Sequence, residues 1–152
     1  MKKVFLASFL MVSLSACGSS DPFPYTDEAR AKLAAAASDV ELNVLLGNSS
    51  HLPEENLSGM INAQIEIYEK AGYSFEETVI EFKEAVIDAS DDERAEFLFR
   101  SRVSFNQMKN DLLHFHRQAE KIDVDLSDYM SDDAADAIVA LATEVDWYNF
   151  GK

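Results

Sequence analysis

The sequence predicts an all-α protein, a single-domain bundle of about five helices packed around one long helix at about residues 91–122. Apolar or small side chains recur there every three or four positions, and neither proline nor glycine interrupts the pattern. Ser90 and Glu93 have the spacing of a capping box at its start. An unbroken helix of this length extends about 48 Å, and its apolar seam requires other helices to cover it. The seam comprises Leu98, Ser101, Phe105, Met108, Leu112, Phe115, Ala119 and Ile122.

Two covering helices are expected before the long one. The first spans about 26–46 and ends at Gly47, a residue type that commonly follows a helix. The second spans about 53–71, with Pro53 in its first turn and Gly72 after its end. The side chains predicted to face inward are Leu33, Ala36, Ala37, Val40 and Val44 in the first helix, and Leu57, Ile61, Ile65 and Tyr68 in the second.

Serine caps predict two further helices. Ser74 and Glu77 repeat the capping-box spacing and open a helix to about Ala89, which should turn back on the long helix. Ser131 opens the last helix, which ends in an aromatic segment at 147–150. The predicted inward residues are Phe75, Val79, Phe82, Val86 and Ala89 in the former, and Ile138, Leu141, Ala142 and Val145 in the latter.

The first seventeen residues have the form of an export signal. A positively charged start at 1–3 precedes an apolar run at 4–14, which is shorter than the about 20 residues that a membrane-spanning helix needs. The run ends in Leu14-Ser15-Ala16-Cys17, which resembles the lipobox of bacterial lipoprotein precursors. The alternative interpretation is an ordinary secretory signal in which the cysteine is incidental.

The lipobox resemblance implies where the protein is located. It implies cleavage before Cys17 and attachment of lipid chains to that cysteine, which together make a firm membrane anchor. Gly18 rather than aspartate follows the cysteine, and this favours the outer membrane of a Gram-negative cell, facing the periplasm, over the inner membrane. We therefore expect a signal peptide at 1–16, a lipidated tether at 17–25 and a helical domain at 26–152.

The expected mature chain is strongly acidic. Loss of Lys2 and Lys3 reduces 13 basic side chains to 11, against 28 acidic ones, for a net charge of −17. Such a chain is repelled by nucleic acid and by anionic lipid headgroups, so membrane contact is expected through the acyl chains alone. Because Cys17 is the only cysteine, its lipidation leaves no thiol for catalysis, metal binding or a disulfide.

Two segments resemble metal sites without completing them. Asp123 and Asp125 begin like an EF-hand loop, but Asp128 and Ala134 occupy the positions where that loop requires glycine and glutamate. We expect instead an acidic connector whose aspartates cap neighbouring helix ends, and the sequence leaves weak calcium binding open.

The two histidines of the long helix also fail to complete a metal-binding motif. Asp111 and His114 have the spacing of one of the two Glu-x-x-His pairs of di-iron bundles, but the second pair is missing, and His116 lies one turn from Glu120. We expect surface or edge histidines, no metal and no cofactor. Nucleophile-elbow, zinc-protease and phosphate-loop motifs do not occur in the sequence, so we expect no enzyme.

An acidic stripe is the main candidate binding surface. Glu77, Glu81, Glu84 and Asp88 recur at helical spacing along the third expected helix. One interpretation is a docking face for a protein with a basic surface. The other is a solvated face that also forms ion pairs with the basic edge of the long helix.

The aromatic end of the chain also has two interpretations. Trp147 and Tyr148, together with Phe150, either close one end of the bundle or expose an interface anchor. From these features we predict a protein-binding or assembly lipoprotein. The alternative is an immunity protein or inhibitor that neutralises a basic toxin or hydrolase in the periplasm. The partner's identity and the oligomeric state stay open.

Overall fold

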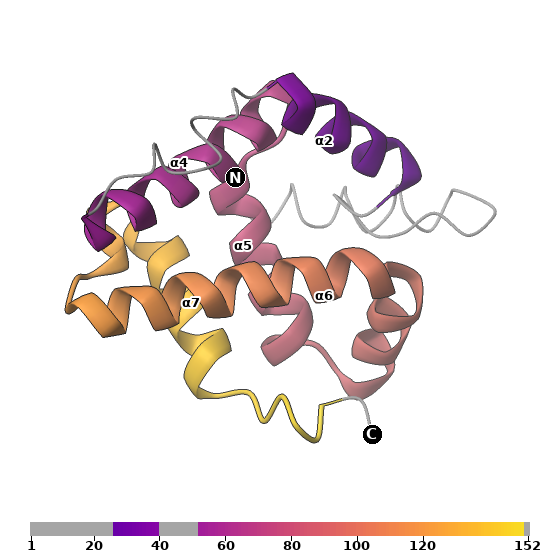
Figure 1. The fold of residues 1–152 in the computed structure, drawn as a ribbon. Helices are drawn as coiled ribbons and strands as arrows, with labels where there is room; N and C mark the ends of the chain where they lie inside the picture. Colours follow the sequence, from indigo (N-terminus) through magenta and orange to yellow (C-terminus); the bar gives the residue numbers. More distant parts are fainter. Residues whose placement is uncertain (1–25, 40–51, 151–152) are drawn as a thin grey trace.

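The structure is a computed structural model that describes residues 26–39 and 52–150. These residues form helices and connecting turns, with no strand among them (Figure 1). The elements are α2 (Asp27–Asp39), α4 (Pro53–Lys70), α5 (Phe75–Lys83), the π-helical segment η2 (Glu84–Asp88), α6 (Asp91–Ile122), the short 3-10 helix η3 (Leu126–Asp128) and α7 (Asp132–Thr143). The predicted all-α architecture is confirmed.

The helices begin at the predicted serine caps. The hydroxyl oxygens of Ser74, Ser90 and Ser131 each accept a hydrogen bond from the backbone amide three residues later, at 3.2, 3.4 and 3.4 Å. At Ser90 the capping box is complete, because the carboxylate of Glu93 accepts from the Ser90 amide at 2.9 Å. Local sequence therefore fixes the starts of α5, α6 and α7.

The two N-terminal helices agree with the prediction over the part of the chain that the structure describes. Pro53 lies in the first turn of α4, and Gly72, just beyond its end, has a φ of +87°, a conformation that glycine adopts readily. In α2, Ala29 and Ala36 are buried and the helix packs against α4. The predicted end of the first helix, with Val40, Val44 and Gly47, lies outside the described residues.

The long helix spans the predicted residues but is not straight, which corrects the expectation of an unbroken rod. Ser101 has non-helical torsions, with φ −112° and ψ 17°. Its buried hydroxyl donates a hydrogen bond to the carbonyl oxygen of Phe97, four residues earlier, and such back-bonding bends helices. Figure 1 shows the consequence, with a first arm (residues 91–100, at the right) turned steeply away from a second arm (residues 102–122).

The second arm of α6 carries the centre of the core. Its buried side chains are the predicted seam residues Phe105, Met108, Leu112, Phe115 and Ala119. They pack with buried residues of α4, α5 and α7, and α5 and α7 also lie against each other. On the first arm Phe97 is buried, whereas Phe99 is 88% exposed.

The chain reverses at Ser90 as predicted, although α5 crosses the second arm of α6 in Figure 1 instead of running alongside it. The first arm of α6 is bonded to the residues just before this reversal. The guanidinium of Arg94 donates to the carbonyl oxygens of Val86 at 2.8 Å and Ala89 at 3.2 Å. These bonds hold the start of α6 against η2.

Candidate functional site

Cys17 and the tether lie outside the described residues. None of the helices in the described ranges is long and apolar enough to cross a membrane.

The acidic stripe is displayed on one face of α5 and η2. Glu77 is exposed, and Glu81 and Glu84 are half-buried one and two turns later. Burial raises the pKa of Glu81 to about 7, and the neighbouring negative charges of Glu77 and Glu84 add to this effect. The three carboxylates therefore repel one another, and ionisation of the middle one is unfavourable in the folded protein.

The last carboxylate of the stripe already has a cationic partner. The ammonium of Lys83 lies 2.6 Å from the carboxylate of Asp88. The sequence predicted ion pairs between the stripe and the basic edge of the long helix. Arg94 instead binds two backbone carbonyls and, at 3.1 Å, the carboxylate of Asp91. The part of the stripe with excess negative charge is thus Glu77, Glu81 and Glu84.

Further acidic side chains lie near the start of α5, on α7. The carboxylate of Glu76 accepts a hydrogen bond from the Ser131 amide at 3.2 Å, which places the first turn of α7 beside the start of α5. The exposed side chains of that part of α7 include Asp132, Asp133 and Asp136.

The aromatic C-terminal segment forms a strap across the core. The indole nitrogen of Trp147 donates to the carbonyl oxygen of Leu141 at 2.8 Å, and Phe150 stacks on Phe105 with ring centroids 5.7 Å apart. The ammonium of Lys109 lies 5.7 Å from the centre of the Trp147 ring. Tyr148, by contrast, is 80% exposed. Each interpretation therefore applies to one of the two residues. Trp147 packs against the core, as a residue that closes the bundle would, and Tyr148 faces solvent, as an interface anchor would.

The acidic connector after α6 behaves as a capping segment at Asp125, whose carboxylate accepts from the Ser127 amide at 2.9 Å and opens η3. His116 lies 3.5 Å from the carboxylate of Glu120, as their one-turn spacing predicts. Within 26–39 and 52–150, no three or more His, Cys, Asp or Glu side chains gather in a group that would hold a metal ion.

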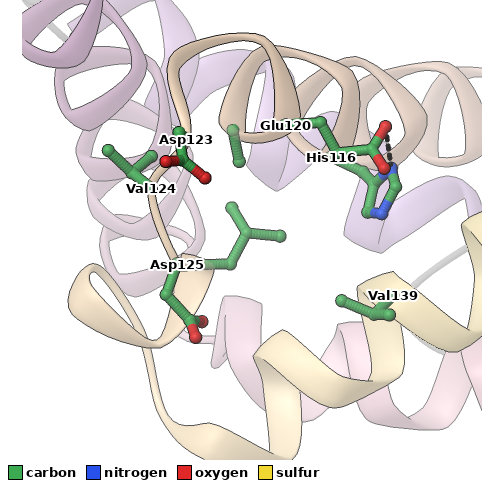
Figure 2. A pocket seen from close by; sticks show the side chains of 8 residues that line it. His116, Glu120, Asp123, Val124, Asp125 and Val139 are labelled. Atoms are coloured by element: carbon green, nitrogen blue, oxygen red, sulfur yellow. Dashed lines mark ion pairs between the residues drawn. The ribbon is translucent and has the colours of Figure 1, made fainter.

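A hollow that the sequence did not reveal lies between α6 and α7 (Figure 2). It has a volume of about 450 Å³, and its wall consists of His116, Ala119 and Glu120 from α6, Asp123, Val124, Asp125 and Leu126 from the connector, and Val139 from α7. The wall joins one continuous stretch, residues 116–126, to Val139 of the next helix, so no local motif marks it. The one available signal is Val139, an apolar residue outside the predicted inward face of α7, which is 43% exposed.

Comparison of the chain with protein-family models, with curated proteins and with solved structures found no match.

Proposed function

We propose that this protein is a lipid-anchored accessory protein of the bacterial envelope that binds a basic protein partner through the acidic face of α5 and η2. The observation that carries the proposal is the crowding of Glu77, Glu81 and Glu84, where three carboxylates share one helix face and the middle one is half-buried. A lysine or arginine from a partner would relieve this repulsion. The role is one of binding, with no catalytic step.

The magnitudes of the competing effects favour binding over stability as the reason for the charge. An exposed ion pair contributes only about 0–1 kcal/mol to folding, and burial of Glu81 among like charges opposes folding. The same charges acting together raise association rates with a basic protein by about 10- to 1,000-fold at low salt.

Tyr148, exposed at the C-terminal strap, is a second candidate contact because exposed tyrosines are frequent interface anchors.

Membrane attachment through Cys17 is the first test of this proposal. The Cys17→Ser variant is expected to move from the membrane fraction to the soluble fraction, because the acyl chains on Cys17 are the proposed anchor. Fractionation followed by immunoblotting measures the distribution, with Ser19→Ala in the tether as the matched control. A serine variant that still sediments with membranes would contradict the lipid anchor.

Association kinetics test the acidic face itself. The partner is first isolated from envelope extract by pull-down, and its association rate is then measured at low and at physiological salt. The triple variant Glu77→Lys, Glu81→Lys, Glu84→Lys is expected to associate at least about tenfold more slowly at low salt, and the difference should shrink as salt screens the charges.

The control for this experiment carries the same change in net charge elsewhere. The control substitutions Glu69→Lys, Glu96→Lys and Glu144→Lys lie on α4, on α6 and just after α7, so none of them changes a residue of the stripe. If both triple variants slow association equally, the effect comes from total charge and the stripe is not the docking face. The partner's identity then separates an assembly role from neutralisation of a basic toxin.

A further inference from the structure

The hollow between α6 and α7 combines two kinds of wall. Ala119 and Leu126 are buried side chains of its wall. Val139 lies on the opposite side of the hollow from Asp123, Val124 and Asp125 of the connector (Figure 2). The exposed carboxylates of Glu120 and Asp123 belong to the same wall. An apolar surface and negative charge therefore meet within one open depression of about 450 Å³.

This combination selects a particular ligand chemistry. A purely apolar ligand would desolvate carboxylates without satisfying them, and an anion would be repelled. A lysine or arginine side chain fits both walls, because its aliphatic stem packs on apolar surface while its charged end reaches a carboxylate.

Two of the acidic side chains in the wall already contact other groups of the protein, and this directs attention to the carboxylate of Asp123. Glu120 contacts His116 at 3.5 Å, and Asp125 caps η3 through the Ser127 amide. Asp123 adopts a left-handed backbone conformation with φ 55°, which occurs in Asp and Asn more than in most residues. In Figure 2 the Asp123 carboxylate lies beside the depression, across from Val139.

We propose that this hollow binds a lysine or arginine side chain of the basic protein partner, with the stem against Val139 and Ala119 and the cation at Asp123, while the nearby carboxylate of Glu120 adds negative charge to the site. The inference rests on the proposed function, because it supplies a specific pocket for the partner whose approach the acidic face of α5 and η2 accelerates. The stripe accounts for the association rate, and the hollow accounts for which side chain is held after association.

A blocked tripeptide with one central lysine tests the hollow without the natural partner. It is titrated into the intact chain while the methyl resonances of Val139 and Ala119 are followed by NMR, and the same peptide with norleucine in place of lysine serves as the uncharged control. We expect the lysine peptide to shift these methyl resonances in a saturable manner and to bind at least about threefold more tightly than the norleucine peptide.

Charge removal at the hollow gives the second arm of the experiment. Glu120→Gln with Asp123→Asn keeps side-chain shape and is expected to weaken lysine-peptide binding about three- to tenfold. The matched double variant Glu69→Gln with Asp92→Asn removes the same net charge elsewhere and should change binding by less than about twofold. Three results would overturn the proposal. These are equal shifts of the methyl resonances with the norleucine peptide, shifts with the lysine peptide that spread evenly over the acidic side chains of α5 and α7, and equal weakening of binding in both double variants.

The natural partner separates the two hypotheses. If the Glu120→Gln, Asp123→Asn variant binds the isolated partner as the parent does while the triple lysine variant on α5 and η2 does not, the hollow is rejected and the proposed function stands. If neither variant changes partner binding, both are rejected.

Discussion

Replacing Phe105 by alanine is expected to lower the free energy of unfolding by about 3–5 kcal/mol, the usual loss for a buried phenylalanine. Its ring, 5% exposed, is the hub of the aromatic core. The ring centroid lies 5.2 Å from that of Phe82, 5.9 Å from Phe97, 6.1 Å from Trp147 and 5.7 Å from Phe150. The substitution leaves a cavity where α5, both arms of α6 and the C-terminal strap meet.

Phe99 provides a matched control on the same helix. Phe99→Ala removes the same atoms from a side chain that is 88% exposed, so the free energy of unfolding should change by no more than about 0.5 kcal/mol. Urea denaturation measures both variants. Trp147 is the only tryptophan, so a red shift of native-state fluorescence in Phe105→Ala alone would report loosening of the strap. Similar small losses in both variants would mean that the strap does not pack on Phe105.

The parts of this fold that depend on near neighbours could be predicted from the sequence. A serine hydroxyl that caps a helix bonds to an amide only three residues away, so Ser74, Ser90 and Ser131 were sufficient to place three helix starts. The seam from Phe105 to Ala119 was similarly accessible because helical periodicity shows which side chains share a face.

The bend in α6 depends on tertiary packing and was missed. The seam pattern continues through Ser101 without proline or glycine, and serine is common enough in helices that its presence did not indicate a bend. Its full burial next to Phe97 leaves the hydroxyl only a backbone carbonyl to bond, and the helix bends there. On the first arm Phe97 is buried, whereas the predicted seam residue Leu98 is only partly buried.

The candidate sites likewise include features that the local sequence shows and features that depend on packing. The acidic stripe recurs along one helix and was visible in the sequence, but the burial of Glu81 required knowledge of the packing around α5. The hollow joins Glu120, Asp123 and Val139 across a turn between two helices, and sequence spacing does not report which turns leave space. Trp147 and Tyr148 are adjacent in sequence, and only the fold distinguishes the side chain that packs against the core from the one that faces solvent.

The half-buried carboxylate of Glu81 makes stability depend on pH near neutrality. Because burial and the charges of Glu77 and Glu84 raise its pKa from an ordinary 4.5 to about 7, the folded state binds more protons than the unfolded state between these values. Stability contributed by this group is therefore fully present below about pH 4.5 and is lost as the pH rises through about 7. The side chain is partly solvated, so we expect a loss of about 1–2 kcal/mol after allowance for screening.

The Glu81→Gln variant isolates this effect, since glutamine has a similar shape and carries no charge. It is expected to be more stable than the parent by about 1–2 kcal/mol at pH 8 and to differ little from it at pH 4.5, as measured by urea denaturation. Glu69→Gln, at an exposed position of α4, removes the same charge and should change stability by no more than about 0.5 kcal/mol at either pH. A gain that is the same at both pH values would refute burial of a charged carboxylate as its cause. If the gain appears only at pH 8, the parent tolerates an unfavourable charge on the same face where a basic partner is proposed to dock, and binding of that partner should then lower the pKa of Glu81.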